Sequence, residues 1–321
     1  EPTPEPKPEP KPEPKPEPKT EPKTEPKTEP KPEPKPEPRR LLPSSLALAL
    51  EDLPSPMGAF ASRWSHAHTA LERTLALVSG LDASARLLCA AWIGVIAASP
   101  DPRWRIDAGN AIVARAWLRR KLRPSEWVQM SARLAAIVAR NPEGPLGAVA
   151  RSLADAGGLT DDLCHALDLA EDREATDLDP ILLDHLASLG SLCRPVRELR
   201  LVAFGTRKLI AGEGEAAWTV RVLRGPEPTP DTEVEWHLGA VTPGSCFLVD
   251  ATGHRTPLAP VLCARACTAC GALEPHAADV LSFADLELDA RCLRCGRSVR
   301  VVSAVPHLRP LRRAVSIWSK R

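Results

Sequence analysis

Four cysteines in the C-terminal part of the chain have the spacing of metal ligands. Cys267 and Cys270 form one Cys-x-x-Cys-Gly pair, and Cys292 and Cys295 form another. Two residues between the cysteines let one tight turn direct both sulfurs to a common point, and the glycine that follows tolerates a positive φ. Two such turns supply four thiolates, the donor set of a closed tetrahedral zinc site. The sequence therefore predicts a structural Zn2+ ion bound by these four cysteines.

The two pairs and their separation resemble the zinc-ribbon family over residues 267–300. The resemblance implies a small β structure that zinc stabilises, because the segment has little core of its own. A redox thiol pair is the alternative, but no thioredoxin-like βαβ pattern surrounds the cysteines. A catalytic zinc is disfavoured because four thiolates leave no position for water. Cys263 and His276 lie close enough in the sequence to substitute as ligands.

Arg63 and His68 form an Arg-x4-His pattern in a segment with helical periodicity. The pattern resembles the ribonuclease motif of HEPN domains, which are helical bundles, and the resemblance extends over residues 57–200. It implies RNA cleavage by these two side chains. Trp64 departs from the family, which usually carries a small polar residue there, and such a short pattern also arises by chance. We therefore assign no catalytic residue and expect a binding protein rather than an enzyme.

Charge is balanced over the whole chain but uneven locally. The formal net charge is +1, so the composition predicts no general attraction to nucleic acid or membranes. After Cys295 the chain carries arginine and lysine, no acidic residue, and Trp318 among them. Such a segment beside a zinc ribbon could bind nucleic acid through phosphate contacts and base stacking. The alternative is a terminal helix that packs on the body of the protein.

The number and spacing of the cysteines and the hydropathy of the chain indicate the compartment in which the protein is expected. The count of nine cysteines is odd and four of them are paired as metal ligands, which favours a reducing compartment, the cytoplasm. No apolar run reaches the length of a membrane span, and residues 87–98 are better explained as a buried helix.

The elements that must position these residues follow one another along the chain. Residues 1–40 alternate proline with glutamate and lysine, which predicts a disordered, extended linker. Apolar residues then recur with a period of 3.6, and from residue 199 with a period of 2. The predicted class is a multidomain α+β protein. Its predicted parts are the linker 1–40, an all-α bundle 41–198, a small antiparallel β domain 199–264, a zinc ribbon 265–305 and a basic C-terminal helix or tail 306–321.

Within the bundle, the pattern predicts a helix from Met57 to Ser79 that Gly80 ends as a C-terminal cap. A second helix is expected from Asp82 to Ala98. Short connections indicate antiparallel neighbours. Further helices are predicted at 104–122, 127–140, 146–156, 161–170 and 180–199.

We expect a non-catalytic binding or regulatory module of a larger bacterial multidomain protein, with another protein as its partner. The excess of arginine over lysine and the abundant alanine favour a GC-rich bacterial genome, and Glu1 in place of Met predicts an upstream domain. Two other functions stay open. One is nucleic-acid binding by the ribbon and the basic C-terminus, and the other is an HEPN-like ribonuclease.

Overall fold

The structure is a computed structural model, and its described part begins at Leu41. The predicted linker 1–40, most of the predicted helix 104–122 and the predicted basic segment 306–321 lie outside it. All described residues belong to one compact unit. The described residues are 41–104, 107, 120–141, 143–171, 178–209, 216–225, 232–235, 241, 243–259, 261–282 and 287–302.

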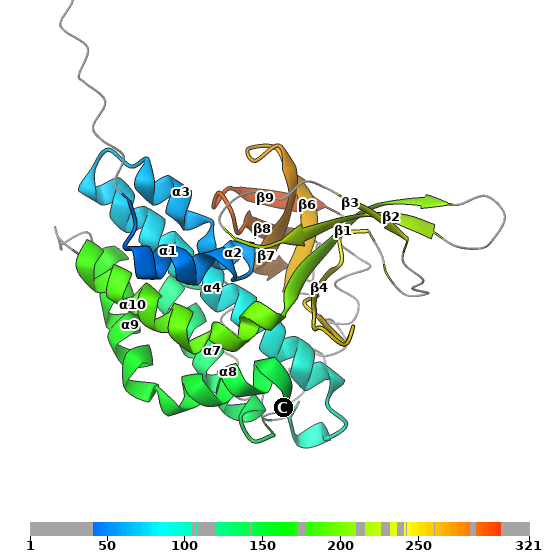
Figure 1. The fold of residues 1–321 in the computed structure, drawn as a ribbon, viewed down its shortest axis with the longest axis horizontal. Coiled ribbons are helices and arrows are strands. Elements are labelled where there is room, and N and C mark those ends of the chain that lie inside the picture. The colour runs from blue at the N-terminus through cyan, green and yellow to red at the C-terminus, as the bar shows by residue number, and fades with distance from the viewer. Residues whose placement is uncertain are drawn as a thin grey trace, which may run out of the picture. The chain divides into compact units, whose positions relative to one another are not determined.

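Helices make up the first half of the described chain and gather on one side of the unit (Figure 1). We call this part the helical body. Its long helix α4 contacts α2, α3, α7, α9 and α10, so the other helices pack around it. The helices are α1 (Ser44–Glu51), α2 (Ser55–Gly58), α3 (Phe60–Ser65), α4 (Ala70–Ala98), α7 (Pro124–Val138), α8 (Gly144–Asp155), α9 (Gly157–Glu171), α10 (Asp179–Leu192) and the 3-10 helix η1 (Arg194–Glu198).

Two antiparallel sheets follow, which confirms the predicted mixed α+β class. The five-stranded sheet has the order β3-β2-β1-β4-β5, and the four-stranded sheet, here called the cysteine sheet, has the order β6-β7-β8-β9. Their strands are β1 (Arg200–Leu209), β2 (Ala216–Leu223), β3 (Thr232–Glu235), β4 (Cys246–Val249), β5 (Arg255–Pro257), β6 (Leu262–Cys267), β7 (Ala272–Ser282), β8 (Glu287–Cys292) and β9 (Ser298–Val302).

The predicted helix break at Gly80 is wrong. Helix α4 runs without interruption from Ala70 to Ala98. A Cβ at Gly80 would lie 2.5 Å from a ring carbon of Phe60, so this glycine lets α3 and α4 approach closely and is not a cap. The sequence alone does not distinguish the two uses of glycine, because the second depends on a residue in another helix.

Helix α4 begins instead at a capping box. The Thr69 hydroxyl accepts a hydrogen bond of 3.1 Å from the Glu72 backbone N–H, and the Glu72 carboxylate accepts one of 3.0 Å from the Thr69 N–H. These bonds satisfy N–H groups that the first helical turn leaves without partners. They also lower the pKa of Glu72, the backbone bonds from Thr69 and His68 being the leading causes.

One hydrophobic core joins the helical body to both sheets. It extends from Leu46 in α1 through Trp92 and Trp127 to Ala290 and Leu293 beside the cysteines. At Gly94, a Cβ would lie 2.2 Å from the carbonyl oxygen of Pro257, so α4 lies directly against β5. The domain boundaries stay a prediction, and the parts on either side of them share this core.

The hydropathy of α4 is high enough for a membrane span, and it is the one such helix among the residues that the structure describes. Within its most apolar window, 83% is buried inside the protein. Burial against other helices accounts for this composition.

Candidate metal centre

The four predicted metal ligands lie together. The Sγ atoms of Cys267, Cys270, Cys292 and Cys295 are all within 4.8 Å of one another. The Sγ atom of Cys267 is 3.6 Å from that of Cys295, and the Sγ atom of Cys270 is 3.8 Å from that of Cys292. In the described part of the chain, this is the cluster of side chains that could hold a metal ion, and it includes neither Cys263 nor His276.

Neighbouring strands supply the two halves of the cluster. Residues 267–271, the first knuckle, connect β6 to β7, and residues 292–296, the second knuckle, connect β8 to β9. Gly271 has φ +68° and Gly296 has φ +75°. Each glycine donates its N–H to the carbonyl of the first cysteine in its knuckle, at 2.8 and 2.9 Å. The positive φ explains why glycine follows each pair.

The sulfur spacing fits zinc. A tetrahedral ion with Zn–S bonds of about 2.3 Å places its sulfurs roughly 3.8 Å apart. The Cys267–Cys295 and Cys270–Cys292 sulfur distances, 3.6 and 3.8 Å, agree with that geometry and are far longer than a disulfide bond of about 2.05 Å. A metal held here would have thiolate on every face, so these residues fit a structural ion.

Protonation differs among the thiols in the metal-free site. Burial raises the pKa of Cys270 to about 12 and raises that of Cys292 well above its ordinary value, and neighbouring thiolates add to both effects. Burial also opposes ionisation of Cys267, but hydrogen bonds from the backbone N–H groups of Cys270 and Ala269 lower its pKa overall. Metal binding must therefore displace protons from this cluster.

Arg63 lies beside the second knuckle. Its Nη2 atom donates a hydrogen bond of 2.9 Å to the Ser79 hydroxyl, and its Nη1 atom is 3.7 Å from the point where a Cβ on Gly296 would stand. Burial lowers the pKa of Arg63, while the charges of Cys295, Cys292 and Cys270 act in the opposite direction. The guanidinium thus faces the cluster from helix α3.

A buried group of charges joins the cysteine sheet to helix α4. The Arg86 Nε atom donates to both carboxylate oxygens of Asp82 at 2.9 Å, and its Nη1 atom lies 2.6 Å from Asp279 Oδ1. Arg291, next to Cys292, reaches both Asp82 and Asp279 at 3.4 Å. Burial opposes the charge of Arg86, but the two carboxylates outweigh it and raise its pKa. The guanidinium also lies 4.5 Å above the ring of Trp127.

Asp279 reaches this group because strand β7 has a bulge. Ala278 pairs with Ala290 and Val280 pairs with Asp289, so Asp279 is the extra residue between them. A bulge redirects the side chain that it carries. This group was not among the residues predicted from the sequence, although Asp82 and Arg86 four residues apart in an apolar helix are a sign of a buried ion pair.

A second buried ion pair connects the two sheets. Arg221 of β2 lies 3.6 Å from the Glu274 carboxylate of β7 and donates to the Leu273 carbonyl at 2.9 Å. Arg294, in the second knuckle, lies 3.7 Å from the same carboxylate. His276 is buried nearby, where its Nδ1 atom is 2.9 Å from the Glu274 carbonyl, and burial lowers its pKa.

The Arg63 and His68 pair is divided between two environments. Arg63 contacts Ser79 and faces the cysteines, while His68 is exposed in the turn before α4, where its backbone N–H donates to Glu72. Trp64, between them in the sequence, is buried. The structure therefore gives Arg63 contacts that the ribonuclease pattern did not include.

Most cysteines outside the cluster are buried in the interior of the protein. Cys89, Cys164, Cys193 and Cys246 are buried, and all nine cysteines are free thiols. Burial raises the pKa of Cys164 to about 11 and that of Cys193 to about 12. Such thiols are poor nucleophiles at neutral pH.

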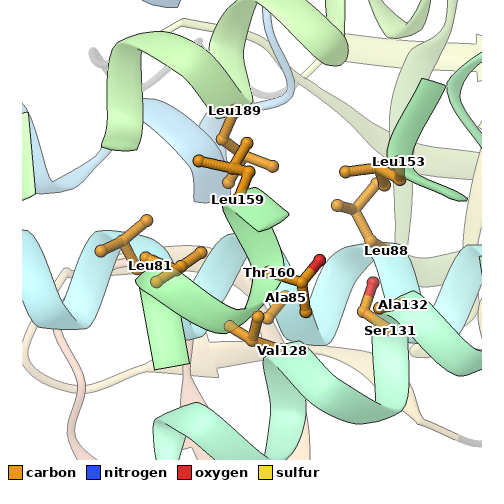
Figure 2. A pocket seen from close by; sticks show the side chains of 11 residues that line it. Leu81, Ala85, Leu88, Val128, Ser131, Ala132, Leu153, Leu159, Thr160 and Leu189 are labelled. Carbon is orange, nitrogen blue, oxygen red and sulfur yellow. The ribbon is translucent and has the colours of Figure 1, made fainter. Parts of the chain in front are cut away.

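A hollow in the helical body is lined almost entirely by apolar side chains (Figure 2). Its polar groups are the hydroxyls of Ser131 and Thr160, and no charged side chain is among the described residues that line it. This lining therefore offers no base to activate either hydroxyl. The hollow is lined by Leu81, Ala85, Leu88, Val128, Ser131, Ala132, Leu153, Leu159, Thr160, Leu163 and Leu189.

In comparisons with protein-family models, with curated proteins and with solved structures, nothing matches this chain.

Proposed function

We propose that the chain is a non-catalytic binding module whose C-terminal sheet is built around one structural zinc ion. The observation that carries the proposal is the set of four thiols within 4.8 Å of one another. Soft thiolate ligands select zinc over hard cations, and a tetrahedral ion would have every position filled by protein. The zinc would hold the two knuckles together and leave no site for a reacting water.

Two further features support the rest of the proposal. Free thiols at all nine cysteines suit a reducing compartment such as the cytoplasm, where thiolate sites persist. Large apolar side chains of the helical body are exposed at Leu48, Leu71, Leu75 and Ile181, and exposed apolar surface favours a protein partner.

Elemental analysis tests the zinc. Protein purified without a metal-chelating tag should contain one equivalent of zinc per chain, and titration of the denatured, chelated protein should count nine thiols. Less than half an equivalent of zinc would contradict the proposal. Zinc that is lost on changing Cys263 to serine, but kept on changing Cys295 to serine, would contradict the ligand set.

Nucleic-acid binding is the second candidate, because basic side chains are exposed on the cysteine sheet. Arg265 lies on β6 and Arg297 immediately follows the second knuckle. If they contact phosphates, changing either one to alanine should weaken binding of single-stranded RNA and DNA alike. It should also reduce the slope of log affinity against log salt by about one. Binding that does not depend on salt would exclude this candidate.

A further inference from the structure

We infer that Arg63 is the counter-cation of the metal centre and that through it the metal controls the packing of α3 and α4 as well as of the cysteine sheet. This inference rests on the proposed structural zinc. It assigns a role to a residue of the helical body more than two hundred positions before the cysteines that it faces.

The first step concerns charge. Zinc bound by four thiolates carries a net charge of −2, and two of the four cysteines, Cys267 and Cys292, are buried. Removing such a charge from water is unfavourable unless an opposite charge lies near it. Arg63 supplies that charge, since its Nη1 atom lies 3.7 Å from the point where a Cβ on Gly296, the residue after Cys295, would stand.

The second step concerns the position of the guanidinium. The Nη2 atom is held by Ser79 on α4, while the Nε atom is buried and has no hydrogen-bond partner among the described residues. Arg63 thus belongs to α3 and is anchored to Ser79 of α4, and its buried Nε–H group is still available as a donor. A cation held in this way strengthens the thiolate site and is in turn stabilised by it.

The third step connects this contact to α4. Ser79 lies one turn before Asp82, which accepts from Arg86 and lies 3.4 Å from Arg291, the neighbour of Cys292. The second knuckle therefore meets α4 at two points, Ser79 through Arg63 and Asp82 through Arg291. Because the coupling between two linked equilibria is reciprocal, tighter metal binding implies firmer packing of α3 and α4.

Substitution of Arg63 tests the inference. Zinc affinity, measured by competition with a chromophoric chelator, should fall 10- to 100-fold in Arg63→Met, the usual range for a lost outer partner of a metal site. Arg63→Lys, which keeps the charge, should retain most of the affinity. The matched control is Arg73→Met, which removes a largely buried ion pair of 2.8 Å that joins α4 to Asp179 of α10 and involves no residue of the cysteine sheet. It should leave zinc affinity unchanged.

Hydrogen exchange gives the second readout. Removing zinc from the unaltered protein should accelerate amide exchange in α3 and in the first half of α4. In Ser79→Ala, which keeps Arg63 but removes its anchor, the effect of zinc removal on α4 should be smaller. This variant keeps the test decisive if Arg63→Met fails to fold.

The outcomes separate the two proposals. If the unaltered protein binds no zinc, the proposed function fails. If it binds one zinc with the same affinity in Arg63→Met and Ser79→Ala, or if zinc removal leaves exchange in α3 and α4 unchanged, the zinc site stands and this inference is overturned.

Discussion

The two knuckles have the same motif and different surroundings. In both, glycine with positive φ donates its N–H to the first cysteine's carbonyl. A Cβ on Gly271 would have no neighbour within 4 Å in the part of the chain that the structure describes, whereas one on Gly296 would lie beside Arg63 and Ser79. Arg291 directly precedes the second knuckle and Arg294 lies within it, and both reach buried carboxylates. The second knuckle is thus fixed to the helical body by its own contacts. The first knuckle would be held in place by the metal that joins it to the second.

Loss of a ligand should have the largest effect. Cys292→Ser and Cys267→Ser should each reduce zinc from one equivalent to near zero, because a structural site of this kind depends on all four thiolates, with an apparent binding free energy of about 10 kcal/mol or more. Metal analysis and circular dichroism measure the outcome.

The different surroundings of the two knuckles predict which of them becomes more mobile when the zinc is removed. After chelation, amide exchange should rise more in 267–271 than in 292–296, since among the described residues the second knuckle alone has anchors in the helical body. Cys263→Ser is the matched control, because Cys263 shares strand β6 with Cys267 but lies outside the cluster, and it should keep its zinc. Equal exchange in the two knuckles would refute the distinction.

Removing an anchor of the second knuckle should have the next largest effect. Asp82→Asn leaves Arg86 and Arg291 short of a buried negative charge, and breaking such a group costs about 3–5 kcal/mol of unfolding free energy. Urea denaturation measures the change. Asp52→Asn breaks an exposed ion pair with Arg224 and should cost less than about 1 kcal/mol. A similar small loss for Asp82→Asn would show that the buried group is not an anchor.

The pH dependence of zinc affinity should show that at least one cysteine in each knuckle is protonated before zinc binds. In the metal-free protein the pKa of Cys270 is raised to about 12 and that of Cys292 is raised well above its ordinary value, so both carry protons at neutral pH. Zinc displaces those protons, and affinity must therefore rise with pH and fall as pH falls. The expected change is at least about 100-fold per pH unit between pH 6 and 8. A tenfold change would indicate that only one thiol is protonated.

Substitution of Gly271 or Gly296 should have the smallest effect on stability, and it compares the two knuckles at equivalent positions. Alanine at either position is strained by the positive φ and should cost roughly 1–2 kcal/mol. The two costs should be equal, because a Cβ at Gly296 makes ordinary contacts of 3.7 and 3.8 Å with Arg63 and Ser79. Leucine should separate them. It extends into open space at Gly271 but displaces Arg63 at Gly296, and zinc affinity should fall only in the second variant.

The cluster of four cysteines that could hold a metal could be predicted from the sequence because its pattern is local. Each Cys-x-x-Cys-Gly pair forms one turn, whatever surrounds it, and the alternation of apolar residues likewise predicted strands such as β2. The residues that surround the cluster could not be predicted in this way. The contact of Arg63 depends on a sheet that comes two hundred positions later, and Asp279 enters the helical body only because β7 carries a bulge.

Helix α4 shows the same limit. Its capping box at Thr69 and Glu72 is a local pattern, but Gly80 was assigned as a helix end because nothing nearby in the sequence identifies Phe60 as its neighbour. Asp82 and Arg86 were recognisable as a helical pair, and their partners on the cysteine sheet were not.

The position of Asp279 has a consequence for synthesis on the ribosome. It follows Arg86 by about 190 residues, so at 5–20 residues per second Arg86 waits roughly 10 to 40 seconds for this partner. Asp82, four residues before Arg86, is present from the start and holds the guanidinium during that interval. The nascent helices can therefore assemble with a neutral pair at their centre, and the late strand completes it.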